Sequence, residues 1–597
     1  MSEEADHSAE EAELQAAIEA VLASSSRKKL VIAGPGTGKT TLFKWLLELS
    51  PGGRDERIVL TFINTLKDDL KDDLGEMAQV YTLHSYCLGL LYRHPALRGP
   101  LSEDFTCRPG LAGLIADDYK IIHGEDAPRF VGKMRALADD DDMRFYLERG
   151  VYYDAADFDD TVYRAYQGLK VGHAPVDSFQ LVLIDEYQDF NAMEAGVIDS
   201  LAETSPIVIA GDDDQALYSQ LRDASWDHIR LLNDAGDYEV HKLPFCMRCP
   251  KVVVDAVNDI ITRANELDRL AGRIDKPYKH FPPVKGSDSA KYPLIDEVET
   301  TVQRQTANYM GQYIAQEIGQ IPDDEIQESL NGGYPTALVI VAQPYRDQIV
   351  RHLEDAGYEV DTKRDSEGRL TRETGLAILK SNAESNLGWR IILAADRPAF
   401  LGDAVRATAD NLTLLADSIP VDYRKHVLAE AEANELPQQT EGAAPQGEGE
   451  LRPSIKVTSF EGAKGLSAQH VYMVGLHDGE LPHDPQSIKD LEICKFIVGL
   501  TRTRKKCTLI HTRNFAGGWK VASCFLDWID PTRLAHLRVD ADYWKQRAAD
   551  DAPGRGGVAL TRGSSRIASL AAHPQRRLDG PPADSEASTR VPKEPNP

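Results

Sequence analysis

The stretch that most constrains this chain is a glycine-rich segment placed directly after a short apolar run. The run is Leu30-Val31-Ile32, and the segment reads Ala33-Gly34-Pro35-Gly36-Thr37-Gly38-Lys39-Thr40. A buried strand, a glycine-rich turn and a helix beginning near Thr41 bring backbone N–H groups and a helix N-terminus together around phosphate groups. Lys39 adds a positive charge at the terminal phosphates, and the Thr40 hydroxyl is a ligand for Mg²⁺. The sequence therefore predicts a nucleotide-binding loop, with Ala33 where the strict pattern has glycine.

A second apolar run ends in acidic residues of the kind that complete such a site. Leu181-Val182-Leu183-Ile184 has the composition of a buried parallel strand. Asp185 follows it directly and can hold the Mg²⁺ shell, whereas Glu186 can orient and deprotonate an attacking water. Solvated acids at a strand end are the alternative interpretation, and the phosphate loop upstream disfavours it.

The composition limits how this chain can meet a polyanion. It has 597 residues, enough for roughly three or four domains, and a formal net charge of −28. A nucleic-acid site must therefore be a local groove rather than a broad basic face. No apolar run reaches the ~18 residues of a membrane span, and the acidic N-terminus is not a signal peptide. We expect a cytoplasmic protein without membrane contact.

Seven cysteines are spread over the whole length, which suits a reducing compartment. Two of them share the spacing Cys246-Met247-Arg248-Cys249. A zinc site would need a second pair at ligand spacing. Ordinary thiols are the default interpretation, and zinc is the alternative.

Alternating strand and helix patterns predict an α/β fold with two parallel-sheet domains and helical insertions. Residues 435–450 have the composition of a linker, and the chain from about 550 has that of a disordered tail. Strands are expected at 57–62, 77–84, 207–210, 338–341, 470–475 and 507–511. The predicted segments are the first domain with the phosphate loop (1–94), a helical insert (95–170), the rest of the first domain (171–250), the start of the second domain (251–365), a small helical insert with a linker (366–452), the rest of the second domain (453–530) and a C-terminal extension (531–597).

Seven further blocks follow one another in a fixed order. They are Leu60-Thr61-Phe62-Ile63-Asn64, Thr82-Leu83-His84-Ser85, Asp157-Phe158-Asp159-Asp160, Gly211-Asp212-Asp213-Asp214-Gln215-Ala216-Leu217-Tyr218, Leu243-Pro244-Phe245-Cys246-Met247-Arg248, Ser459-Phe460-Glu461-Gly462-Ala463-Lys464-Gly465-Leu466 and Val498-Gly499-Leu500-Thr501-Arg502-Thr503-Arg504-Lys505. In this order the blocks resemble those of the superfamily 1 helicases of the UvrD/Rep type, over roughly residues 10 to 515. The resemblance implies two RecA-like domains of the P-loop NTPase class. The short insertions are similar to those of compact members, among them the helicase-like subunit of the Gabija antiphage system.

The resemblance also implies roles for individual residues. Gln15 would read adenine, Gln215 would sense the γ-phosphate, and Gly465 would contact the nucleotide. Arg248 would lie near the γ-phosphate, and Arg502 would be an arginine finger supplied by the second domain. Because Arg502 follows the apolar Phe496-Ile497-Val498, we expect it at a strand end. The implied path of a nucleic-acid strand runs along Phe62, Asn64, Thr82, His84 and Tyr218.

Several positions depart from the family pattern. Gln220 stands where the family stacks a base on tryptophan, and such stacking contributes about 1–3 kcal/mol per base. Met247 replaces an adenine-stacking tyrosine, which affects base selectivity. The other departures are Leu221 for arginine (with Arg222 one place late), Glu461 for histidine and Ser467 for a ribose-binding glutamate.

Three functions are consistent with these residues. The first is an ATP- and Mg²⁺-dependent DNA helicase or translocase that binds single-stranded or tailed duplex DNA and moves 3′ to 5′. The second is a nucleic-acid-gated ATPase subunit of a larger DNA-processing or antiphage assembly, which meets a protein partner through the inserts or the tail. The third is a nucleotide-binding switch without hydrolysis, which an intact Glu186 and Arg502 disfavour.

Overall fold

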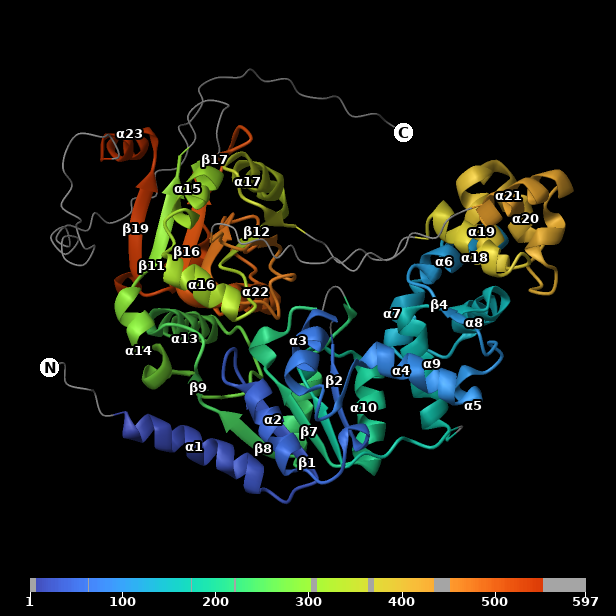
Figure 1. The fold of residues 1–597 in the computed structure, drawn as a ribbon, viewed down its shortest axis with the longest axis horizontal. Coiled ribbons are helices and arrows are strands. Elements are labelled where there is room, and N and C mark those ends of the chain that lie inside the picture. Colours follow the sequence, from blue (N-terminus) through green and yellow to red (C-terminus); the bar gives the residue numbers. More distant parts are fainter. Residues whose placement is uncertain are drawn as a thin grey trace, which may run out of the picture. The chain divides into compact units, whose positions relative to one another are not determined.

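The computed structural model of the chain describes residues 7–62, 64–172, 174–218, 222–301, 309–362, 370–433 and 451–550. It contains one sheet of six strands and one of seven, and neighbouring strands in both are parallel (Figure 1). This arrangement confirms the predicted α/β class with two parallel-sheet domains and helical insertions. The boundaries predicted for the seven segments stay predictions.

The first sheet brings the two halves of the nucleotide motif to one edge. Its spatial order is β3 (Gln79–Thr82), β2 (Arg57–Thr61), β6 (Leu181–Ile184), β7 (Ile207–Gly211), β1 (Lys28–Ala33) and β8 (Glu239–Leu243). Only β7 separates β1 from β6. Since parallel strands end at the same edge, the loop after β1 and the acidic pair after β6 lie near each other.

Both faces of this sheet are buried, because successive side chains of a strand point to opposite faces. Leu30 and Ile32 join a core with α4 (Leu83–Arg93) and α10 (Ala192–Thr204). Val31 and Ala33 join a second core with α1 (Ser8–Ala23), α2 (Lys39–Leu49) and α3 (Asn64–Leu74). Burial on both sides explains why these strands are continuous apolar runs.

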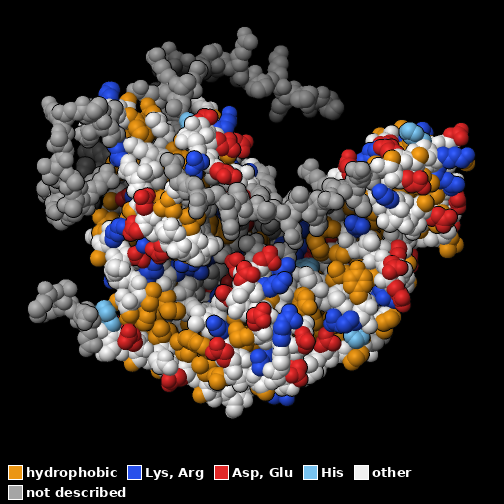
Figure 2. Space-filling view, in the orientation of Figure 1, with side chains coloured by type: hydrophobic (Ala, Val, Ile, Leu, Met, Phe, Trp, Pro, Cys, Tyr) orange, Lys and Arg blue, Asp and Glu red, His pale blue; other side chains and the backbone are white. Residues whose placement is uncertain are grey.

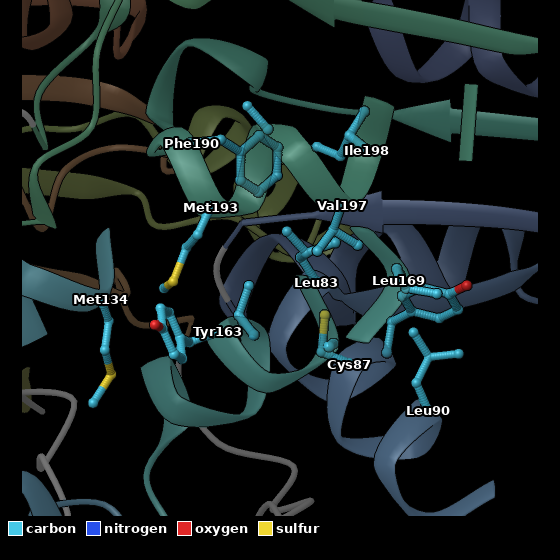
Figure 3. Packing of buried hydrophobic residues seen from close by; sticks show 14 of the residues in the cluster. Leu83, Cys87, Leu90, Met134, Tyr163, Leu169, Phe190, Met193, Val197 and Ile198 are labelled. Atoms are coloured by element: carbon cyan, nitrogen blue, oxygen red, sulfur yellow. The ribbon is translucent and has the colours of Figure 1, made fainter. Parts of the chain in front are cut away.

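The chain between α4 and β6 forms a helical insert. Figure 3 shows its central contact, where Tyr163 and Leu169 lie among Leu83, Cys87 and side chains of α10. The helices of the insert are α5 (Pro95–Arg98), α6 (Leu111–His123), α7 (Phe130–Arg135), α8 (Asp141–Tyr153) and α9 (Phe158–Lys170). The insert therefore shares one hydrophobic core with the first domain.

The second sheet forms a separate core. It runs β13 (Val360–Asp361), β14 (Ile455–Thr458), β12 (Ala337–Val341), β15 (Ala468–Val474), β16 (Thr503–Thr512), β11 (Ile295–Thr300) and β19 (Leu534–Val539). Apolar residues of α13 (Lys251–Glu266) and α22 (Asp490–Leu500) pack against this sheet. The remaining helices of this domain are α14 (Pro282–Lys291), α15 (Tyr309–Ile318), α16 (Asp323–Asn331) and α17 (Gln343–Asp355).

The second insert contacts the first insert through buried charges. Asp118 of the first insert accepts hydrogen bonds from Arg149 at 2.7 Å and from Arg390 at 2.7 Å. Arg149 also donates to the Thr408 carbonyl at 2.9 Å. Buried charges are tolerated when they are paired and hydrogen-bonded, as here. The helices of the second insert are α18 (Arg372–Ser381), α19 (Asn386–Asp396), α20 (Pro398–Arg406) and α21 (Val421–Ala433).

Two local predictions were wrong. Phe496-Ile497-Val498 lies in helix α22 rather than in a strand, so Arg502 does not follow a strand end. The strand expected at 77–84 is the shorter β3, and His84 belongs to helix α4. Short apolar runs do not distinguish a strand from a buried helix, which explains the first error.

The predicted linker at 435–450 and the predicted tail after residue 550 lie outside the described residues. The chain divides into two compact units, Met1–Ala541 and Asp542–Pro597. Helix α23 (Ala541–Asp550) is the described element of the second unit. Among the described helices, none combines the length and the apolar character that a bilayer crossing requires.

Candidate nucleotide site

The predicted phosphate loop is a tight turn between β1 and α2. Gly36 and Gly38 have φ values of +71° and +90°, which favour glycine, and Gly38 immediately precedes α2. A Cβ atom at Gly36 would lie 2.4 Å from the Arg248 Cβ, and one at Gly38 would lie 2.7 Å from the Met247 Cε. The Met247 N–H donates to the Gly36 carbonyl at 2.9 Å. The Met247-Arg248 turn is therefore packed directly on the loop.

Lys39 and the acidic pair are close together, as the sequence predicts. The Lys39 ammonium donates to Glu186 and lies 3.6 Å from an oxygen of Asp185. Burial acts to lower the pKa of Lys39, but the two carboxylates outweigh it and raise that pKa above its ordinary value. Lys39 is thus a permanent cation between the loop and the carboxylates.

Glu186 has the geometry and charge of a residue that orients water. Its backbone is left-handed, with φ of 54°, and its carboxylate accepts a hydrogen bond from Gln188 at 2.6 Å. Burial acts to raise its pKa, but Lys39 and then Lys464 lower it well below the ordinary range. Glu186 is therefore ionised at neutral pH, and its carboxylate can accept a hydrogen bond from a water molecule.

Gln215 connects the nucleotide edge of the first sheet to the second domain. Its amide nitrogen donates to Asp212 at 2.9 Å, and its amide oxygen accepts from Arg502 at 3.2 Å. The Asp212 N–H in turn donates to the Gln188 side chain at 2.9 Å. This chain of bonds runs from Glu186 through Gln188, Asp212 and Gln215 to Arg502.

Arg502 is buried between the two domains. It lies in the turn between α22 and β16, and it donates to the carbonyl groups of Val498 at 2.9 Å and Leu466 at 3.2 Å. Burial, followed by repulsion from Arg248, lowers the pKa of Arg502 to about 10. Arg248 itself donates to the Thr501 carbonyl at 3.4 Å. Arg502 therefore stays charged at neutral pH, with the Arg248 guanidinium near enough to repel it.

Lys464 and Tyr278 lie at this site but had no role in the sequence prediction. Lys464, from the second domain, donates to Asp189 and to the Gln215 carbonyl, and it lies 3.6 Å from Glu186. Lys464 belongs to the block at 459–466, but nothing in its spacing indicates which residue it contacts. Tyr278 was also missed: its hydroxyl donates to the Pro35 carbonyl at 3.1 Å beneath the loop.

Other residues predicted to contact the nucleotide include both exposed and buried positions. Gln15 is exposed, and its amide donates to Glu19 of the same helix at 2.8 Å. Thr41 is exposed on α2, whereas Thr37 is buried and donates to the Gly34 carbonyl at 2.9 Å. Gly465 has a φ of +82°, as a close backbone approach requires. The nucleotide contacts predicted for these residues stay predictions.

The residues of the predicted strand path are mostly buried. Phe62 is 3% exposed, and its ring lies 5.1 Å from Tyr218 and beneath the Arg222 guanidinium at 4.5 Å. Thr82 caps helix α4 by accepting from the Ser85 N–H. His84 lies 3.2 Å from Arg222, and burial followed by that arginine lowers the His84 pKa to about 3. In this conformation these residues are therefore packed inside the first domain.

The other path positions are only partly described. Gln220 and Leu221 lie outside the described residues, as does the side chain of Asn64. The Tyr218 hydroxyl donates to the Glu461 carbonyl of the second domain at 3.3 Å. Tyr218 is therefore a predicted path residue that also contacts the second domain.

Comparison with family models and curated proteins shows that the chain is similar to known helicases. The family model of the AAA domain matches residues 16–220. DNA helicase II of Haemophilus influenzae is 21% identical, with 81% of this chain and 82% of that protein covered. DNA helicase II of Escherichia coli is 24% identical over 41% of this chain and 40% of its own length. The ATP-dependent DNA helicase PcrA of Staphylococcus epidermidis is 25% identical over 47% of this chain and 42% of its own length. These similarities confirm the resemblance to superfamily 1 helicases of the UvrD type.

Proposed function

We propose that this UvrD-like chain hydrolyses ATP at the edge of its first sheet and uses the cycle to move along single-stranded DNA. The observation that carries the proposal is the bond between Arg502 and Gln215, which joins the second domain to the nucleotide edge of the first. An arginine supplied from a second domain makes hydrolysis depend on how the domains meet. That dependence converts a chemical cycle into motion.

The residues around the loop divide the chemistry of phosphoryl transfer between them. Lys39 and the loop N–H groups would bind the β- and γ-phosphates. Hard oxygen donors suit Mg²⁺, and the buried Asp185 carboxylate with the Thr40 hydroxyl offers such a set. When bound, this ion would neutralise phosphate charge.

The remaining groups act on the attacking water and on the transition state. Glu186 is held ionised and hydrogen-bonded to Gln188, so it can orient a water molecule and accept its proton. Arg248 and Arg502 would stabilise the charge that develops on the transferred phosphoryl group.

A short physical route leads from the nucleotide to the predicted strand path. Gln215 contacts Arg502, and three residues later Tyr218 packs against Phe62 and donates to the Glu461 carbonyl. A change at the γ-phosphate that moves Gln215 would therefore move the Tyr218 ring. On the face drawn in Figure 2, Lys and Arg are interspersed with Asp and Glu, which fits a local DNA groove rather than a broad basic face.

The burial of the path residues favours a second candidate function. Phe62 and His84 are enclosed by neighbouring side chains, and glutamine replaces the stacking tryptophan at position 220. Weak base stacking would leave an ATPase that responds to DNA but separates strands poorly without a partner. Such a subunit of a larger assembly would use the same nucleotide site.

Unwinding of duplexes with a 3′ or a 5′ single-stranded tail distinguishes these candidates. A 3′-to-5′ helicase unwinds the 3′-tailed duplex in the presence of ATP and leaves the 5′-tailed duplex intact. ATP hydrolysis stimulated by single strands without unwinding of either duplex would favour the partner-dependent subunit. Preferential unwinding of the 5′-tailed duplex would contradict the proposed direction.

A further inference from the structure

The two cysteines of the Cys246-Met247-Arg248-Cys249 motif have no role in the proposed hydrolysis, yet they lie at the nucleotide site. Cys246 ends the short strand β9 (Phe245–Cys246), and Cys249 comes two residues before helix α13. Both side chains are fully buried and both thiols are free.

The two sulfur atoms are arranged as a nucleophile and its partner. The Cys249 N–H donates to the Cys246 sulfur at 3.4 Å, and the Cys249 thiol and the Tyr278 hydroxyl lie near the same sulfur. Burial acts to raise the pKa of Cys246, but the polar groups of Cys249 and Tyr278 outweigh it and lower that pKa to about 6. Burial raises the pKa of Cys249. Cys246 is thus the thiolate of the pair, and Cys249 is the thiol beside it.

The pair encloses the turn that packs on the phosphate loop. Between the cysteines, Met247 donates its N–H to the Gly36 carbonyl at 2.9 Å. A Cβ atom at Gly36 would lie 3.3 Å from the Cys246 sulfur. On the other side, the Cys249 thiol donates to the Thr501 carbonyl at 3.6 Å, beside Arg502. A chemical change at these sulfur atoms would therefore alter contacts with both domains.

We propose that Cys246 and Cys249 form a reversible disulfide on exposure to a hydroperoxide, and that this disulfide lowers ATP turnover by displacing the Met247-Arg248 turn. The second half rests on the proposed ATPase function, whereas the first half does not. The cysteine pair is thereby a modification site through which an oxidant controls the nucleotide site.

The chemistry balances with one peroxide molecule for each pair. The Cys246 thiolate attacks a peroxide oxygen, the O–O bond breaks, and the released hydroxide takes a proton to leave as water. The Cys246 sulfenic acid that results is attacked by the Cys249 sulfur. The S–O bond breaks, and the hydroxide leaves as water with the Cys249 proton. Two thiols and one hydrogen peroxide thus yield one disulfide and two waters, and a dithiol reductant reverses the change.

The disulfide alters the site because its geometry differs from that of two thiols. The sulfur atoms must approach to about 2.05 Å, so the residues between them must shift. The Cys249 sulfur then no longer donates to Thr501, and the turn bearing Arg248 moves against Gly36. A displacement of about 1 Å in a positioned catalytic group can cost about 10²-fold in rate.

Peptide mapping with trypsin identifies this disulfide directly, because the protease cleaves between the cysteines after Arg248. Full-length protein is treated with hydrogen peroxide, blocked with an alkylating agent and digested without reductant. The proposal predicts that the peptides 243–248 and 249–251 appear joined by a disulfide, and that ATP turnover falls about 10²-fold and returns with dithiothreitol. Unlinked, fully alkylated peptides after peroxide treatment would overturn it.

Two variants separate this effect from other oxidation, each compared with its own untreated sample. Cys246→Ser removes the nucleophile and should keep its turnover under peroxide. Cys107→Ser is the matched control, because its thiol lies in the first insert, and it should be inactivated as the wild type is. Equal losses in Cys246→Ser, or losses that dithiothreitol does not restore, would assign the effect to Met247 or another residue and overturn the proposal. If reduced wild type hydrolysed no ATP, the proposed function would fail, while the linked peptides would still decide whether the disulfide forms.

Discussion

Replacing Arg502 with alanine tests whether the second domain takes part in hydrolysis. Arg502 is 2% exposed, and its guanidinium donates to the Gln215 amide oxygen at 3.2 Å, beside Arg248. In the proposed reaction, the Arg502 charge that would face the transferred phosphoryl group comes from the second domain. An arginine of this kind is worth about 10³-fold or more in turnover, which corresponds to about 4 kcal/mol in the barrier. We therefore expect Arg502→Ala to lower kcat about 10³-fold while ATP still binds.

The substitution also removes donors from buried carbonyl groups, so stability must be followed separately. Loss of the bond to the Leu466 carbonyl should cost about 1–3 kcal/mol, whereas the Val498 carbonyl still accepts from the Thr501 hydroxyl at 3.0 Å. Thermal unfolding shows whether the variant is folded at the assay temperature, and equilibrium binding of a fluorescent ATP analogue shows whether the loop is intact.

Two further variants complete this test. Arg502→Lys keeps the charge without the planar fork and should recover only part of the rate. Arg504→Ala is the matched control, because Arg504 donates to Ser467 at 2.9 Å and stacks on Tyr334 rather than contacting Gln215. A folded, ATP-binding Arg502→Ala protein with kcat within about tenfold of the wild type would refute the role of a transition-state arginine.

Three other perturbations have defined outcomes. Glu186→Gln should retain ATP binding and lose about 10²-fold or more in turnover, and a near-normal single-turnover rate would exclude Glu186 as the base. In the wild type the lowered pKa of Glu186 means that this carboxylate should contribute no transition in turnover between pH 5 and 7. Because the folded His84 pKa of about 3 lies below its ordinary value of 6.5, the unfolded chain binds the extra proton as pH falls. In denaturant titrations the wild type should therefore lose more of its free energy of unfolding than His84→Gln as pH falls below 6.5, and the same pH dependence in both proteins would contradict this assignment. Gln220→Trp should tighten single-strand binding by about 1–3 kcal/mol in a titration of labelled oligonucleotide, and an unchanged affinity would mean that base stacking at this position is not limiting.

The sequence was sufficient to predict the parts of the site that follow strands. The loop after Ile32 and the acids after Ile184 are local patterns, and parallel pairing then brings them to one edge. The position of Arg502 was predicted wrongly because Phe496-Ile497-Val498 fits a buried strand and a buried helix equally well.

Contacts between distant segments left no signal in the sequence. Lys464 reaches Asp189 across the two domains, and Asp118 pairs with Arg390 across the two inserts. Nothing in the spacing of such charges identifies their partners. The burial of Phe62 likewise depends on Phe190 and Tyr218, which other elements supply.

The rate of ATP hydrolysis with and without single-stranded DNA tests the central claim most directly. Arg502, Gln215 and Tyr218 link the nucleotide edge to the predicted strand path, so DNA on that path should change how the second domain meets the first. A folded wild-type protein is predicted to hydrolyse ATP slowly alone and about tenfold or more faster with saturating single strands, and Arg502→Ala to lose that increase. The same rate with and without DNA would contradict the account, because the nucleotide site would then be independent of the strand path.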